Sequence, residues 1–401
     1  MAADATGWAR QRSGLAVLAP AALVAFAFAG STMVTPLYPL YQRAFGFSQL
    51  TLTLIYAAYV IGNLLALVLF GRLPDQLGRH RMAYAAIAIA CGSAVLFLLA
   101  TGTPWLFPAR IASGLAVGIG AGTGTAWIAD LDDGGDKSRA TVIATCANFA
   151  GLGLGPLCGG LLAQYAPWPL RLVYGLYFLA LLLVGLSLRL APETVAAPKP
   201  RPDAAALRPR LGVPAAVVGR FIAPAATAFG TFSLFGFYFS LIPSLLAKDL
   251  HRPDPGLAGA VVLELSAAAA ACIVATRRLE SRRAMLVGSV LLLPSVALLV
   301  CAREFASMGI LLGGTALSGI AGALGYRGSL QVVNRIAPGG QRAELVSSYM
   351  IACFLGNSVP VIGIGVLSGQ IGAAAAIRIF AATVAAFAAG GLVAGLRYRR
   401  D

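Results

Sequence analysis

The sequence predicts an all-α integral membrane protein in which twelve transmembrane helices form two pseudo-symmetric bundles of six. Three observations predict this fold class. Of the 401 residues, 59% are hydrophobic and 11% are charged, against about 25% charged residues in ordinary soluble domains. The apolar residues form runs long enough to cross a bilayer, and the runs do not alternate as barrel strands do. The two halves of the chain also resemble each other.

The apolar runs come in two groups of six. The first group covers residues 14–41, 48–70, 82–101, 104–129, 140–165 and 169–190. The second group covers residues 214–246, 256–276, 284–301, 305–333, 343–368 and 372–396. The proline-rich polar segment between them resists helix formation and suits a linker. We therefore expect a first bundle at residues 1–190, a linker at 191–213 and a second bundle at 214–401.

The halves repeat each other at a nearly constant offset. Ser138-Arg139-Ala140 matches Gln341-Arg342-Ala343, and Met82 matches Met285 at the same spacing. A parallel duplication points to two bundles related by an axis along the membrane normal, with a substrate site near the midplane between them.

Basic residues set the expected topology. The net charge is +15, and most Lys and Arg residues lie in the termini, the linker and the loops after even-numbered helices. This distribution predicts that both termini and the linker are cytoplasmic, and the membrane we expect is the plasma (inner) membrane. Because the charges form short clusters that suit an anionic leaflet, we expect no nucleic-acid partner. The first apolar run is too long for a signal peptide, so we expect an uncleaved first helix.

Motifs for other chemistries are missing. The six cysteines have no CxxC spacing, both histidines lie in predicted loops, and there is no Walker loop or Ser-His-Asp set. We therefore expect no metal, no cofactor and no enzymatic activity. The expected partners are a small-molecule substrate and the lipid bilayer, and we expect the chain to function as a monomer.

The loop after the second predicted helix is the most distinctive motif. Gly71, Leu73, Asp75, Gly78 and Arg79 are spaced as in the G-x-L-a-D-r-x-G-r-k loop of the major facilitator superfamily, which the chain resembles. The resemblance implies a cytoplasmic latch between the two halves, and a loop that only sets topology is the alternative. Asp75 can accept hydrogen bonds from Arg79, Arg81 or Arg139. The predicted gating residues are Gly71, Asp75, Gly78, Arg79, Arg81, Asp130 and Arg139.

Two further motifs resemble those of the drug:proton antiporters of this superfamily. Arg110-Ile111-Ala112-Ser113-Gly114-Leu115-Ala116-Val117-Gly118 matches an R-x-x-x-G-x-x-x-G pattern in the fourth helix, and the resemblance implies a part in proton coupling for Arg110. Snorkelling to the outer surface is the alternative for Arg110. The fifth helix resembles g-x-x-x-G-P-x-x-G-G through Gly151, Gly155, Pro156, Gly159 and Gly160. We expect these residues to make a close, bendable contact with the opposite half.

The first helix lacks the carboxylate that many proton-coupled exporters carry. The one acidic residue predicted well inside a helix is Glu264, in the eighth. Burial disfavours its ionised form, so it can load and release protons during transport, together with Arg110. A hydrogen-bonded structural Glu is the alternative. Protons are thus the expected coupling ion.

The expected substrate cavity is largely apolar. Phe232, Phe235 and Phe239 share one face of the seventh helix with Phe229, and an aromatic face suits apolar substrates. Contact of this face with lipid or with its own bundle is the alternative. Arg327 can attract an anionic substrate or snorkel to the inner surface. The predicted cavity residues are Phe26, Met33, Phe232, Phe235, Phe239, Tyr326, Arg327 and Asn357.

These features together predict a secondary transporter that works by alternating access and exports a small, largely apolar compound in exchange for protons. Two alternatives remain open. The first is a facilitator or importer of a small polar metabolite. The second is a membrane sensor, built on a transporter scaffold, that does not transport.

Overall fold

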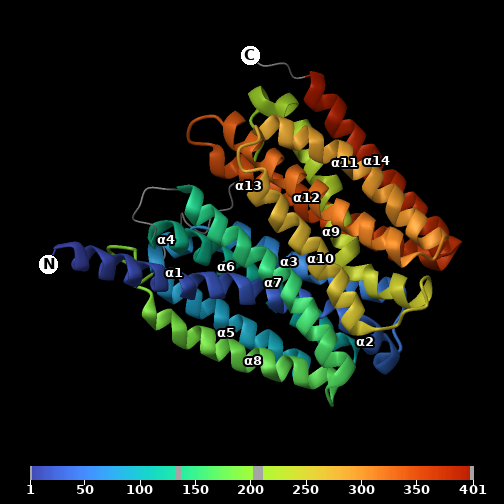
Figure 1. Ribbon diagram of the computed structural model, residues 1–401, viewed down its shortest axis with the longest axis horizontal. Coiled ribbons are helices and arrows are strands. Elements are labelled where there is room, and N and C mark those ends of the chain that lie inside the picture. The colour runs from blue at the N-terminus through green and yellow to red at the C-terminus, as the bar shows by residue number, and fades with distance from the viewer. Residues whose placement is uncertain (1, 132–136, 202–210, 398–401) are drawn as a thin grey trace. The chain divides into compact units, whose positions relative to one another are not determined.

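The computed structural model describes residues 2–131, 137–201 and 211–397, and within these ranges all regular secondary structure is helical (Figure 1). The described residues contain 12 helices long and apolar enough to cross a membrane, so the predicted fold class is confirmed. The helices of the first half are α1 (Ala2–Thr32), α2 (Tyr38–Phe45), α3 (Gln49–Leu65), α4 (Leu73–Leu77), α5 (Arg79–Leu98), α6 (Thr103–Leu131), α7 (Lys137–Tyr165) and α8 (Pro169–Ser187). Those of the second half are α9 (Val218–Lys248), α10 (Pro255–Ala275), α11 (Ser281–Glu304), α12 (Met308–Ile336), α13 (Arg342–Ile371) and α14 (Ala373–Arg397).

The first predicted span is interrupted in the structure. α1 ends at Thr32, a short 3₁₀ turn, η1, follows at Thr35–Leu37, and α2 begins at Tyr38. Pro36 and Pro39 explain the break, because neither has the N–H group that a continuous α-helix needs from each residue. This interruption leaves the last carbonyls of α1 without partners in their own helix.

The residues form two compact units. The first comprises Met1–Val34 and Ala58–Pro209, and the second comprises Thr35–Ala57 and Arg210–Asp401. Residues 35–57 therefore belong to the second unit, although they precede the linker in sequence. Side-chain hydrogen bonds fix them there. Thr35 Oγ1 donates to the Phe239 carbonyl oxygen at 2.7 Å, and Tyr56 Oη donates to Asn357 Oδ1 at 3.0 Å.

Inside the first unit, α1 packs against α6 and α7, and α5 packs against α6 and α8. Inside the second unit, α9 packs against α12, α13 and α14, and 83% of its most apolar stretch is buried. The pair α11 and α12 approach closely at Gly288 and Gly328, where an added Cβ atom would strike backbone atoms of the facing helix. Small residues therefore set the spacing between these two helices. This is usual in membranes, where burial of apolar surface does not drive helices together.

In each unit we distinguish two ends. The linker end is the one next to residues 191–201 in the first unit and residues 211–217 in the second. The far end is opposite, where α9 ends at Lys248 and α14 begins at Ala373.

Candidate functional site

The predicted gating loop lies at the linker end of the first unit and is built on two glycines. α3 widens into a π-helical turn, η2 (Ala66–Phe70), just before Gly71. A Cβ atom on Gly71 would lie 2.8 Å from the Leu67 carbonyl oxygen. Gly78 has φ +97°, a conformation that L side chains rarely adopt, and a Cβ there would lie 2.7 Å from Glu193 Oε2. Both positions therefore require glycine.

Arg79 joins two carboxylates at this loop. Its Nη1 lies 2.7 Å from Asp75 Oδ1 and its Nε donates to Asp130 Oδ2 at 2.9 Å. The Arg79 side chain is 8% exposed, whereas that of Asp75 is 66% exposed. The structure thus brings Asp75, Arg79 and Asp130 together. It places the other two predicted gating residues elsewhere: Arg81 Nη1 donates to the Lys199 carbonyl oxygen at 3.1 Å, and Arg139 is exposed.

The first residues of the linker form hydrogen bonds with this loop and its neighbours. This contact was not predicted from the sequence. The Glu193 carboxylate accepts from the backbone N–H groups of Arg79 at 2.9 Å and His80 at 3.0 Å. These are the first two residues of α5, so Glu193 caps the helix and faces the positive end of its dipole. Trp127 Nε1 donates to the Pro192 carbonyl oxygen at 2.9 Å, and Thr194 Oγ1 donates to Asp130 Oδ2 at 2.8 Å. We call residues 191–195 with their partners Arg79, His80, Trp127 and Asp130 the linker clasp.

Two further observations describe the clasp. The His80 ring packs edge-on against Trp127 with centroids 4.7 Å apart, and its Nε2 lies 2.8 Å from the Ala191 carbonyl oxygen. Burial raises the pKa of Glu193, but backbone N–H donors, including those of Arg79, Val195 and His80, outweigh it, and the net pKa is lowered. Since the folded-state pKa lies below the usual value, the ionised carboxylate stabilises the clasp at neutral pH. That contribution is lost as the pH falls through the lowered pKa.

Arg110 sits at the junction of α6, α1 and α3. Its side chain is 1% exposed, so it does not snorkel to a surface. Nη1 donates to the Ser31 carbonyl oxygen at 2.6 Å, and the guanidinium lies 4.9 Å from the centroid of the Tyr59 ring. Ser31 is in the last turn of α1, so the cation meets the negative end of that helix dipole. The Arg110 charge is therefore satisfied by a carbonyl and an aromatic face inside the first unit.

The glycines of the same motif let α6 approach α3 and the π-helical turn η2 that follows it. A Cβ atom on Gly114 would strike the Tyr59 carbonyl oxygen, and one on Gly118 would strike the side chain of Ala66. Tyr59 thus contacts Arg110 through its ring and Gly114 through its backbone. The arginine and the two glycines act as one surface along α6.

The α7 motif contacts α1 and the residue just beyond it. Cβ atoms on Gly151, Gly155 and Gly159 would meet the carbonyl oxygens of Ala25, Ala29 and Met33, respectively. Pro156 and Gly160 are buried beside them. The close contact that we expected with the opposite half is therefore made inside the first unit. A stripe of small residues fits whichever helix lies next to it, and the spacing does not specify which helix that is.

The other predicted cavity residues of the first half lie in this unit too. Met33 is 7% exposed and faces α7. Phe26 lines a small void with residues of α5, α6 and α8, and its carbonyl oxygen accepts from Tyr177 Oη at 2.9 Å.

Aromatic side chains cluster between α9 and α12 in the second unit. Phe232 and Tyr326 meet edge to face with centroids 5.4 Å apart, and Phe235 lies 6.1 Å from Phe232 and 6.2 Å from Phe239. The Phe235 ring occupies the space that a Cβ on Gly322 would take. Phe229 instead stacks on Phe387 of α14 at 4.0 Å. Four of the predicted cavity residues therefore form one surface, and Phe229 is not part of it.

Glu264 is half-buried in α10. Its Oε2 has no hydrogen-bond partner among the described residues. It interacts electrostatically with Tyr238, whose hydroxyl lies 3.3 Å from Ser318 Oγ and accepts from Thr315 Oγ1 at 3.2 Å. The charge of the Glu264 carboxylate therefore acts on a group of three hydroxyls that are hydrogen-bonded to one another.

Arg327 caps a helix end. Its Nη1 donates to the Thr276 carbonyl oxygen at 2.7 Å, and Nη2 donates to that of Leu279 at 2.9 Å, just after α10. This geometry favours an anchoring role over attraction of a substrate. Asn357, 7% exposed, accepts from Tyr56 as described above.

Comparison with known proteins identifies the family. The sequence profile of the Major Facilitator Superfamily matches residues 21–280. The 3-(3-hydroxy-phenyl)propionate transporter of Escherichia coli K12 is 26% identical over 371 residues, which are 88% of this chain and 85% of that protein. Multidrug resistance protein 2 of Bacillus subtilis is 27% identical over 139 residues, and the match spans only 35% of either protein.

The solved structures show the same architecture. The crystal structure of a bacterial homolog to the human lysosomal transporter Spinster superposes with a TM-score of 0.74. The superposition covers 97% of this chain and 99% of that one at 16% identity, which supports the fold and nothing finer. With most of its length matched by the family profile and twelve apolar helices in place, the chain belongs to the Major Facilitator Superfamily of membrane transporters.

Proposed function

We propose that this chain exports a small, largely apolar compound across the plasma (inner) membrane in exchange for protons, with both termini and the linker in the cytoplasm. Glu264 carries the proposal. A carboxyl oxygen that lacks a hydrogen-bond partner in an apolar segment favours the neutral acid, and a change in its surroundings would shift it toward the ionised form. Alternating access supplies such a change. Glu264 is the proposed proton carrier, and Tyr238 with Ser318 and Thr315 the polar path beside it.

The aromatic surface formed by Phe232, Phe235, Phe239 and Tyr326 supports an apolar substrate. Flat rings offer contact area without charged partners, and Arg327, a cation within α12, is already bound to carbonyl oxygens of the segment after α10. We therefore propose a substrate with an aromatic or apolar body.

Transport of a small aromatic carboxylate is the second candidate function. It is favoured by the relative that matches along most of the chain, whose name gives it as a transporter of 3-(3-hydroxy-phenyl)propionate. Because sequence identity of 26% does not fix a substrate, this compound enters the tests below as a probe.

The proposal is tested with inside-out vesicles from a host that expresses the chain. Respiration acidifies the lumen, and an acridine dye reports the pH gradient. Adding ethidium, or 3-(3-hydroxyphenyl)propionate, is expected to collapse part of the gradient, because each molecule taken up releases protons. Glu264→Gln, which keeps the shape of the side chain but cannot ionise, is expected to abolish this proton release.

The controls separate the alternatives. Glu304→Gln removes a carboxylate at the surface end of α11 and is expected to behave as the unaltered protein. Uptake that proceeds equally without a gradient would instead indicate a facilitator. Full gradient dependence in Glu264→Gln would exclude Glu264 as the proton carrier.

The gating loop gives a second test in the same vesicles. Asp75→Asn weakens the ion pair with Arg79 and is expected to slow probe transport severalfold. Little loss of folded protein is expected, because Asp75 is largely exposed and Arg79 keeps its bond to Asp130. Asp130→Asn is expected to have the larger effect, since Asp130 also holds Thr194 of the clasp. The effects of both substitutions are measured as transport rates normalised to the amount of folded protein. Unchanged transport in both variants would reduce the loop to a topology signal.

A further inference from the structure

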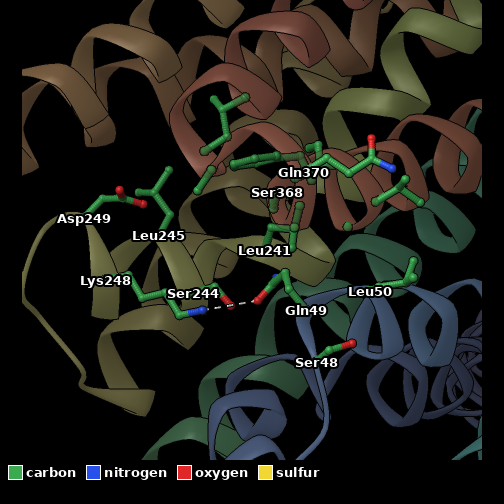
Figure 2. A pocket seen from close by; sticks show the side chains of 17 residues that line it. Ser48, Gln49, Leu50, Leu241, Ser244, Leu245, Lys248, Asp249, Ser368 and Gln370 are labelled. Carbon is green, nitrogen blue, oxygen red and sulfur yellow. Dashed lines mark hydrogen bonds between the residues drawn. The ribbon is translucent and has the colours of Figure 1, made fainter.

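A cavity of about 460 Å³ opens at the far end of the second unit, away from the aromatic surface. It lies between the first turn of α3, the last turns of α9 and α13, and the first turns of α14, as Figure 2 shows. We call it the far-end cavity. Its volume lies in the range of about 300–1,000 Å³ that is usual for small-molecule sites.

One face of α9 forms the floor of this cavity. Leu241, Ser244, Leu245 and Lys248 recur at helical spacing and line it, with the apolar part deeper along the helix and the ammonium group at the helix end. Ile364 of α13 and Ile377 of α14 add apolar surface. The cavity is therefore amphipathic, with one charged end.

Two polar groups here lack a strong hydrogen-bond partner within the part of the chain that the structure describes. Ser244 is 9% exposed, and its Oγ has no hydrogen-bond partner among the described residues, which is costly for a buried hydroxyl. Lys248 Nζ donates to the neutral Gln49 Oε1 at a long 3.5 Å (Figure 2). Both side chains lie one turn apart on the same helix face.

The carboxylate next to them does not neutralise Lys248. Asp249 lines the cavity, but its Oδ1 accepts from Arg303 Nη2 at 3.0 Å. The positive ends of α3 and α14 and the negative ends of α9 and α13 all lie at the cavity wall, so the helix dipoles oppose one another. The Lys248 ammonium group, which pairs with no carboxylate among the described residues, is what favours an anion.

We propose that the far-end cavity binds a small amphipathic carboxylate. Its head group would accept from Lys248 Nζ, and from Ser244 Oγ after a rotation that turns this buried hydroxyl toward the cavity. Its apolar body would lie on Leu241, Leu245 and Ile364. The single lysine at this cavity, with the Ser244 hydroxyl one turn away on the same helix, matches one carboxylate group. Bound there, the ligand would also join residues 48–50 to α9 and α13, and so stabilise the second unit.

Binding to the purified full chain tests the proposal, independently of any transport. The probes are 4-phenylbutyrate, its neutral amide and decanoate, each titrated calorimetrically into protein in a non-ionic detergent. The unaltered protein is expected to bind 4-phenylbutyrate and not the amide. Lys248→Gln is expected to weaken binding about tenfold or more, because the head group loses its charged donor. High salt is expected to weaken it as well, since the site is open to solvent.

Two variants make the result specific. Gly369 lines the cavity, and a Cβ atom added there meets no atom within 4 Å, so Gly369→Leu is expected to fill the space and block binding without harming the fold. Arg252→Gln removes an exposed cation near Lys248 that does not line the cavity, and it is expected to bind as the unaltered protein does.

The outcomes are decisive. Binding of decanoate alone, with the same loss in Lys248→Gln, supports the site and assigns the ligand to fatty acids from the membrane. Equal binding by the amide, equal binding by the Lys248→Gln and Gly369→Leu variants, or no binding of any probe up to its solubility limit overturns the proposal.

Discussion

Arg110→Leu is expected to abolish gradient-driven transport and to lower the melting temperature of the purified protein. The buried guanidinium donates to the last turn of α1 and lies over Tyr59 of α3, so its loss leaves the Ser31 carbonyl oxygen without this donor and removes the tie between three helices. A hydrogen bond to a charged group contributes about 1.5–3 kcal/mol, which corresponds to a rate change of at least about tenfold if the bond is needed in the cycle.

Arg110→Lys separates charge from geometry. Lysine keeps the positive charge, but its compact ammonium group cannot both reach the carbonyl and stack on the ring. We expect near-normal amounts of folded protein with transport still reduced about tenfold. Arg171→Leu, at an exposed position, serves as the control. Full transport activity in Arg110→Lys would show that the charge alone suffices.

Gly114→Ala is expected to destabilise the first unit strongly. The new methyl group would strike the Tyr59 carbonyl oxygen and lie 3.0 Å from Asn63 N, and backbone atoms of a packed helix cannot move aside as a flexible side chain can. Overpacking costs about 1–3 kcal/mol, so the melting temperature should fall by roughly 3–10 °C.

Gly122→Ala is the matched control for this effect. It places the same methyl group on the same helix, where no atom lies within 4 Å. Helix propensity alone then predicts an unchanged or slightly higher melting temperature. Equal melting temperatures of the two variants in a thermal-shift measurement would contradict the close approach of α6 to α3.

Local patterns predicted the fold and part of the gating loop. Twelve apolar runs give twelve helices because in a bilayer each helix must satisfy its own backbone, whatever its neighbours are. Asp75 of α4 and Arg79 at the start of α5 lie on either side of the tight turn at Gly78, and the motif spacing was enough to predict that they pair.

Contacts between segments that are distant in the sequence could not be predicted from local patterns. Glu193 meets Arg79 across more than a hundred residues, and nothing in the polar linker distinguishes a capping carboxylate from a solvated one. Likewise, the glycines of α7 indicate a close contact but not its partner, and residues 35–57 join the second unit through side chains of α9 and α13. Arg110 and Arg327 lie in α6 and α12, within the apolar segments predicted from the sequence, but their carbonyl partners at helix ends were not predicted.

Two backbone anchors beyond the linker clasp shorten the free part of the chain that joins the two units. Lys199 is anchored through its backbone N–H to the Gln76 carbonyl oxygen at 2.7 Å, and Gly212 is anchored to Ser348 by two hydrogen bonds of 3.1 and 3.2 Å. Only residues 200–211 lie between these anchors, about half of the segment that composition assigns to the linker. A chain of this length spans at most roughly 45 Å when fully extended. That contour length is a ceiling on how far Lys199 and Gly212 can separate during a transport cycle while both anchors hold.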